Sequence, residues 1–131
     1  MMSLEEMHSY LVAPEIEPRQ LLRCALAVRS SEIQAYFALL GEKRVQVEGM
    51  ARKLGKSRAT AQRLLQDLVS KGLAIRTESF IGRGGYLYEY RAVPPEKVKE
   101  TMKRIIDEWH EKMVKYLEEF PRAVQREAAK Q

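Results

Sequence analysis

The chain has 131 residues, of which 45% are hydrophobic and 31% charged, and this length fits one domain. It has one cysteine, so no internal disulfide can form, and a reducing cytoplasm is the expected location. No run approaches the ~18 consecutive apolar residues of a membrane span, and the acidic N-terminus does not match a secretory signal. The formal net charge is +5, and residues 52–91 hold nine Lys/Arg against three Asp/Glu, which favours a polyanionic partner such as nucleic acid.

The first 17 residues, 1–17, are predicted to form a flexible arm or a short helix over about 4–12. Ser3-Leu4-Glu5-Glu6 matches a capping box, and Pro14 and Pro18 then interrupt the helical pattern. This segment is therefore expected to lie outside the main domain.

Two amphipathic helices are predicted next. The first covers 19–28 and ends near Ser30, and Cys24 is expected on or near its buried side as a small hydrophobic residue. Ser30 is expected to cap the second helix, which stops at Gly41. A very short strand is allowed at 45–47.

A helix-turn-helix is predicted around Gly55-Lys56-Ser57. The helix before this turn covers 47–55, and the helix after it covers 58–71, with Ser57 as its cap and Gly72 as its stop. The second helix has an apolar face and an outward polar face, and an α-helix fits the DNA major groove, where Arg pairs with guanine and Gln with adenine. The predicted DNA-binding side chains of this unit are Lys56, Ser57, Arg58, Thr60, Gln62, Arg63 and Gln66.

The spacing of apolar residues then changes to that of strands. Strands are predicted over 73–81 and 86–93, joined by the glycine-rich tip 82–85. Arg83 stands among three glycines in this tip, and arginine is favoured in a narrow minor groove. The tip is therefore predicted to contact DNA, although glycines also suit a turn that has no further role.

A long helix is predicted from Pro95 to about residue 120, with Pro121 ending it and a polar tail over 121–131. Apolar residues recur in two eleven-residue repeats, which is close to the period of a straight helix. The helix is interpreted as a dimerisation helix, although it could cover residues 19–40 of its own chain instead. The predicted dimer contacts are Met102, Ile105, Trp109, Met113, Tyr116 and Phe120. A two-fold dimer would place two recognition helices ~34 Å apart and predicts a palindromic operator.

The order of these elements over about residues 30–98 resembles the winged-helix transcriptional regulators of the TrmB-like group, close to the MarR type. The resemblance rests on the helix-turn-helix ARKLGKSRATAQRLLQDLVSKGL and on the exit from the hairpin, YRAVPPE. It implies a dimeric DNA-binding repressor or activator of archaeal type. Full-length TrmB-type regulators carry a C-terminal sugar-binding domain, so this chain resembles a short form, and sugar sensing is not carried over.

The predicted fold is mainly α with a small β-hairpin: a winged helix-turn-helix over 18–93, followed by a long dimerisation helix over 94–120. No enzyme motif, metal-ligand spacing or cofactor motif is found, and the two histidines, His8 and His110, lie far apart in sequence. The predicted function is sequence-specific binding of double-stranded DNA by a homodimer. A protein-interaction module and chromatin-like, non-specific DNA binding are the alternatives. Whether a small-molecule effector binds is left open.

Overall fold

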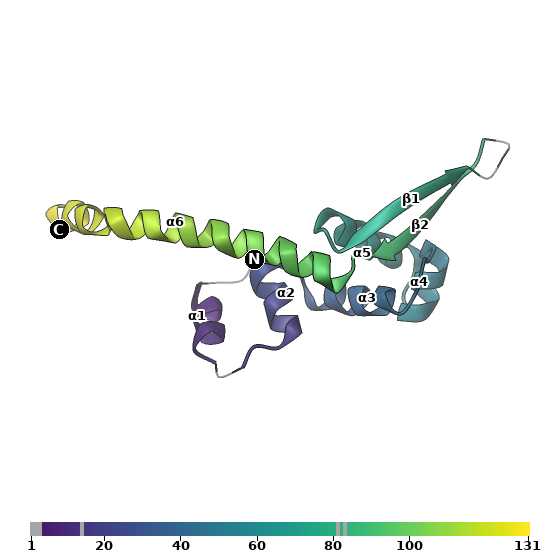
Figure 1. Ribbon diagram of the computed structural model, residues 1–131, viewed down its shortest axis with the longest axis horizontal. Helices are drawn as coiled ribbons and strands as arrows, with labels where there is room; N and C mark the ends of the chain where they lie inside the picture. The colour runs from purple at the N-terminus through teal and green to yellow at the C-terminus, as the bar shows by residue number, and fades with distance from the viewer. Residues whose placement is uncertain (1–3, 14, 81, 83) are drawn as a thin grey trace.

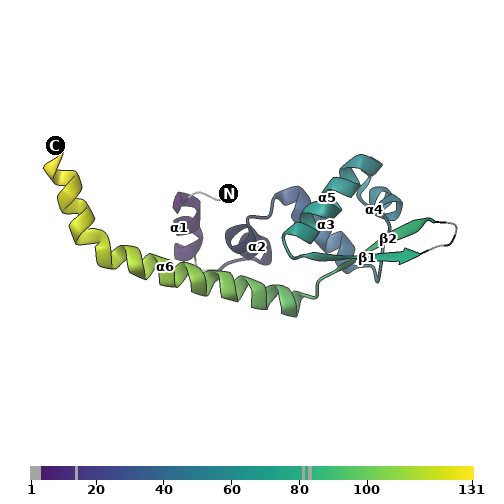
Figure 2. The ribbon, with the colours of Figure 1, turned by 90° about the horizontal axis from the view of Figure 1, so that it is seen from above.

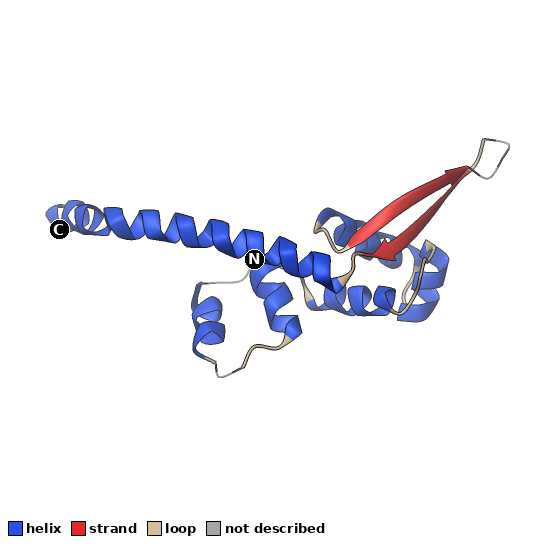
Figure 3. Ribbon diagram, in the orientation of Figure 1, coloured by secondary structure: helices blue, strands red, loops and turns tan. Residues whose placement is uncertain are grey.

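The computed structural model describes residues 4–13, 15–80, 82 and 84–131. Figure 1 shows a compact group of helices with a protruding hairpin at one end and a long helix extending from it, and Figure 3 separates helices from strands by colour. The predicted fold class is confirmed. In chain order the elements are α1 Leu4–Val12, α2 Pro18–Leu26, α3 Ser30–Leu40, α4 Val47–Leu54, α5 Arg58–Ser70, β1 Ala74–Phe80, β2 Tyr86–Ala92 and α6 Pro95–Ala129.

The core lies between α3, α4, α5 and the base of the hairpin. Its side chains are almost entirely removed from water, and burial of each large apolar side chain contributes roughly 1.5–3 kcal/mol. The hydroxyl of Tyr36 donates a hydrogen bond to the carbonyl of Val93 at 2.8 Å, which ties α3 to the exit of the hairpin. The largest buried apolar side chains are Ile33, Leu39, Met50, Leu64, Leu65, Leu68 and Leu73.

The two strands pair antiparallel, from Ala74 opposite Ala92 to Phe80 opposite Tyr86. Beside them, the backbone of Val45 exchanges two hydrogen bonds with Tyr90, at 2.9 and 2.8 Å. The very short strand allowed at 45–47 is therefore a single bridge, because α4 already begins at residue 47.

The junction between α2 and α3 differs from the prediction. The first of these helices ends at Leu26 rather than near Ser30, because Ala27 adopts a left-handed conformation with φ 55° and its N–H donates to the Arg23 carbonyl. Ser30 is the first helical residue of α3 and not its cap. Instead, a Glu32 carboxylate oxygen accepts a hydrogen bond from the Arg29 N–H at 2.8 Å. Ser3, the expected cap of the first helix, lies outside the described residues.

The predicted end of the long helix at Pro121 is wrong. Helix α6 has 35 residues, about 52 Å at 1.5 Å per residue, and Pro121 lies inside it. Most of the expected polar tail is therefore helical. A proline removes one backbone hydrogen bond and crowds the preceding turn, which can bend a helix without ending it. Figure 2 shows the C-terminal part of α6 turning away from the line of its earlier turns. Within the described residues, no helix is long and apolar enough to cross a membrane.

Candidate nucleic-acid interface

Helix α5 begins from a well-defined turn. Gly55 ends α4 in the left-handed conformation, with φ 66°, which only glycine adopts without strain. The Ser57 Oγ then accepts a hydrogen bond from the Thr60 N–H at 3.1 Å, as predicted for the cap. This cap satisfies one of the free N–H groups of the first turn and fixes where the helix starts.

The two faces of α5 have opposite character. Ala61, Leu64, Leu65 and Leu68 are at most 2% exposed and pack into the core. The predicted DNA-binding side chains lie in the turn or on the accessible surface of the helix. Five are exposed and two are half-buried: Lys56, Ser57, Arg58, Arg63 and Gln66 in the first group, Thr60 and Gln62 in the second. Arg83 lies outside the described residues.

One predicted side chain has a partner that the sequence did not indicate. Arg58 Nε donates to a Glu48 carboxylate oxygen of α4 at 2.9 Å, and its terminal nitrogen lies 3.4 Å from the Gln62 side-chain oxygen. The hydrogen bond from Arg58 lowers the pKa of Glu48 from its ordinary value. The pair orients the guanidinium across the helix-turn-helix and offsets part of its positive charge.

A buried carboxylate secures the other end of α5. Glu32 of α3 is fully buried, and Lys71, directly after α5, donates to it at 2.6 Å. Arg29 contacts the same carboxylate at 3.3 Å and also Asp67 of α5 at 3.1 Å. Burial raises the pKa of Glu32, but the hydrogen bonds from Lys71 and from the backbone and side chain of Arg29 outweigh burial and lower it to about 2. The side chain of Asp67 is thus engaged with Arg29.

A groove separates α5 from the hairpin. Arg58, Gln62 and Gln66 line it from the helix, and Arg76 and three tyrosines, Tyr86, Tyr88 and Tyr90, line it from the strands. The Arg76 guanidinium lies 4.8 Å from the centre of the Tyr88 ring, within the range of a cation–π contact. The alternation of the tyrosines at 86, 88 and 90 places them on one face of the strand, a signal in the sequence that points to this groove.

The six predicted dimer contacts divide into two groups. Met102 packs against the core, and Ile105 and Trp109 lie against α2 of the same chain. Farther along α6, Met113, Tyr116 and Phe120 are exposed, and Phe120 is 60% exposed. The first half of α6 therefore covers its own chain, and its second half presents an apolar face that the described residues leave uncovered.

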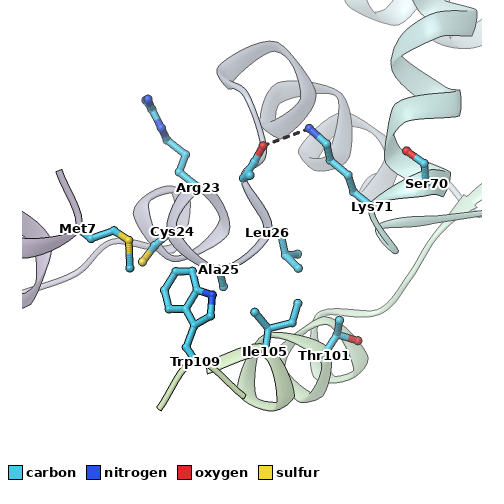
Figure 4. Close-up of a pocket in the computed structure, with 11 residues that line it drawn as sticks. Met7, Arg23, Cys24, Ala25, Leu26, Ser70, Lys71, Thr101, Ile105 and Trp109 are labelled. Atoms are coloured by element: carbon cyan, nitrogen blue, oxygen red, sulfur yellow. Dashed lines mark hydrogen bonds between the residues drawn. The ribbon is translucent and has the colours of Figure 1, made fainter. Parts of the chain in front are cut away.

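A cavity of about 410 Å³ lies between α1, α2, the end of α5 and α6. Figure 4 shows Met7, Cys24 and Trp109 side by side, with Lys71 donating to the Ala27 carbonyl at 3.1 Å. Burial raises the pKa of the Cys24 thiol, which agrees with a packing role. Within the described part of the chain, no group of three or more His, Cys, Asp or Glu side chains could hold a metal ion.

The helix-turn-helix and its hairpin define a winged-helix protein of the transcription-regulator class. Residues 22–96 match the family described as sugar-specific transcriptional regulator TrmB, and the chain belongs to this family. It is 33% identical over 100 residues to the uncharacterized protein MJ1503 of Methanocaldococcus jannaschii, covering 76% of both chains.

Two solved structures share the fold. A possible transcriptional regulator from Methanosarcina mazei Go1 has a TM-score of 0.69 and 20% identity, over 82% of this chain and 92% of that one. TrmBL2, described as an archaeal chromatin protein with a novel mode of DNA binding, has a TM-score of 0.56 and 22% identity, over 82% of this chain and 38% of its own.

Proposed function

We propose that this protein is a sequence-specific regulator that binds double-stranded DNA as a homodimer, with residues 58–71 in the major groove and the wing 82–85 on the backbone or in the minor groove. The observation that carries the proposal is the two-faced helix α5. Its leucines fill the core, while Arg63 and Gln66 are exposed on the opposite side. Family membership supports the same function.

The outward side chains divide by the part of DNA that they suit. Lys56, Ser57 and Arg58 lie at the N-terminal end of α5, where cationic side chains and free N–H groups favour phosphate. Gln62, Arg63 and Gln66 follow along the helix and have the donor and acceptor groups that read adenine and guanine edges. Arg83 is assigned to the wing contact by its residue type and its place in the sequence.

The homodimer is assigned to the second half of α6. Its exposed apolar side chains form a face that a monomer would leave in water, and a second copy of the same helix offers a matching apolar face. Met113, Tyr116 and Phe120 are the proposed contacts between copies. The other three predicted contacts are instead proposed to hold α6 against its own chain. Met102 packs against the core, and Ile105 and Trp109 line the cavity beside α2.

The test is selection of bound sequences from a random DNA pool, carried out at two salt concentrations. A palindrome with half-sites about one helical turn apart is expected to be enriched, and the enrichment should persist at the higher salt. Binding without any enriched sequence would contradict the proposal.

Chromatin-like binding is the second candidate function, because the fold is shared with a protein described as an archaeal chromatin protein. It would depend on phosphate contacts alone, so log Kd should depend steeply on log salt with little sequence preference.

A small-molecule effector is assigned to the cavity beside Trp109, the single tryptophan of the chain. Residues of α6 and Lys71, at the end of α5, both line the cavity. A compound bound there would therefore contact both the proposed dimer helix and the end of the recognition helix. A compound that binds there should change tryptophan fluorescence and DNA affinity together. A change in fluorescence with DNA affinity unaltered would contradict this role.

A further inference from the structure

The hairpin carries an aromatic pair that contact between α5 and the major groove does not explain. Phe80 and Tyr86 oppose each other at the outer end of the ladder, and their rings meet edge to face with centroids 6.0 Å apart. Phe80 is 68% exposed and Tyr86 is 58% exposed. Such a pair places two large apolar surfaces in water at the outer ends of β1 and β2, two strands that project from the group of helices (Figure 1).

The pair lies on the face of the hairpin that looks toward α5. Opposed residues of an antiparallel ladder share a face, and the face repeats every second residue. Phe80 and Tyr86 therefore share a face with Arg76, Tyr88 and Tyr90. At the base of the hairpin Tyr90 is buried in the core, and farther out the tyrosines line the groove beside α5. The aromatic pair thus continues the proposed DNA-binding surface outward.

The hairpin is long enough to reach a second groove of the duplex. Six residue steps separate the base pair of the ladder, Ala74 with Ala92, from Phe80 with Tyr86, and each step spans ~3.4 Å, or about 20 Å together. Neighbouring major and minor grooves lie half a helical turn apart, about 17 Å. Measured along the strands from the base of the hairpin, this length matches the groove spacing, so the minor groove of a duplex seated on α5 is within reach of the outer end.

We infer that Phe80 and Tyr86 form an apolar wedge that enters the minor groove and partly unstacks one base step, so that binding bends the DNA. This inference rests on the proposed DNA-binding function. Apolar side chains inserted at a base step kink duplexes in this way, and over residues 74–92 the hairpin carries three arginines against two glutamates, a small positive net charge that favours approach to a minor groove. Pyrimidine–purine steps deform most easily, so the wedge adds sequence preference outside the bases that α5 reads.

A structural role is the alternative for this pair, since cross-strand aromatic pairs also stabilise hairpins. The two roles differ in what they do to DNA. A stabilising pair leaves the shape of the bound duplex unchanged, whereas a wedge sets its bend angle. The measurement must therefore report DNA shape as well as affinity.

The experiment uses a duplex that carries the selected site, with donor and acceptor dyes at its ends and 2-aminopurine at the flanking step. The wild-type protein is expected to bend it by roughly 20–90° and to raise the 2-aminopurine fluorescence. Phe80→Thr/Tyr86→Thr keeps strand-forming residues but removes both rings. This variant should leave the duplex nearly straight, with Kd raised no more than about tenfold because the contacts of α5 remain.

The matched control is Ile75→Thr, which removes an exposed apolar side chain from the other face of the same hairpin. It should bend the duplex as the wild type does. A comparison that needs no variant replaces a TA step at the flank by a stiff A-tract, which should weaken binding of the wild-type protein by roughly tenfold. Equal affinity for the two flanks would overturn the inference.

The outcomes separate this inference from the proposed function. If the wild type selects and binds a palindrome but leaves it straight, the wedge inference is wrong and the proposed regulator function stands. The same conclusion follows if the double variant bends the duplex as much as the wild type does. If the wild type binds no DNA, both are wrong. If loss of the two rings lowers the sedimenting mass without DNA and leaves the bend unchanged, the pair is a protein contact and the wedge is overturned.

Discussion

Replacing Glu32 by glutamine tests the buried network that holds the recognition helix. Glutamine has nearly the same shape, and its amide oxygen can still accept hydrogen bonds from the Arg29 N–H and from Lys71. The substitution therefore removes the negative charge while leaving the packing almost unchanged. Lys71, whose side chain is 27% exposed, then keeps its positive charge without the carboxylate that faces it.

The size of the effect follows from the pKa of the carboxyl. A pKa lowered from 4.5 to about 2 means that folding favours the ionised form by about 3 kcal/mol, since each pH unit is worth about 1.4 kcal/mol. Because the pKa is lower in the folded state, this contribution is present in full above the unfolded value of about 4.5. It is lost as the pH falls toward and through 2.

The assay is urea unfolding at a series of pH values, followed by far-ultraviolet circular dichroism. At pH 7 Glu32→Gln should lower the free energy of unfolding by about 2–3 kcal/mol, with an unchanged dependence on urea. The difference between the two proteins should shrink below pH 4.5 and largely vanish below pH 2. Asp67→Asn is the matched control, because it removes a more exposed partner of Arg29 and should cost less than about 1 kcal/mol.

Two results would refute this reasoning. A difference between wild type and Glu32→Gln that stays constant from pH 7 to pH 2 would mean that packing, not charge, is responsible. A loss at pH 7 no larger than that of Asp67→Asn would mean that Lys71 and Arg29 do not stabilise the carboxylate as their distances indicate.

Three further expectations concern the DNA-binding face, the long helix and the thiol. Arg63→Ala should cost about 1–3 kcal/mol in binding and relax preference at one base position, measured by competition between operator variants. Phe120→Ser should lower the dimer fraction in sedimentation because the ring is exposed, whereas Trp109→Ala should mainly lower the free energy of unfolding, by about 1–3 kcal/mol, because the ring packs on its own chain. Burial raises the pKa of Cys24, so its reaction with a thiol reagent at pH 7 should be slower than that of a free cysteine and should accelerate as the pH rises.

Each of these expectations has a contrary result. An even loss of affinity across all sequences would reassign Arg63 to phosphate contact. A dimer fraction that falls for Trp109→Ala but not for Phe120→Ser would mean that the first half of α6, and not the second, forms the contact between copies. A Cys24 thiol that reacts as fast as a free cysteine would show that the cavity is open to solvent at this point.

The parts of the fold that depend on neighbouring residues were predictable from the sequence. Ser57 and Gly72 mark the ends of α5, and the helical spacing of its leucines indicates which face is buried. After Gly72 the spacing of apolar residues changes to the alternation that is typical of strands. This change predicts the hairpin, because buried residues recur at different intervals in strands and in helices. These features involve residues only a few positions apart, where local chemistry determines the backbone.

The features that were missed depend on contacts between distant segments. Arg58 meets Glu48 from another helix, and Lys71 reaches Glu32 across 39 positions of the chain. No local spacing predicts such pairs. Pro121 was misinterpreted for a related reason: proline disfavours a helix, but a long helix with many remaining hydrogen bonds tolerates the loss of one.

The division of α5 into a buried and an accessible side has an evolutionary consequence. The residues that keep the helix in place, from the leucines to Lys71, all lie behind or beyond the positions assigned to bases. Exchanges at Gln62, Arg63 and Gln66 would change the surface that α5 offers to bases with little change to the core, since substitutions outside the core usually alter stability only slightly. If these positions read bases as proposed, a lineage with this architecture would acquire new target sites by few mutations and at little risk to folding.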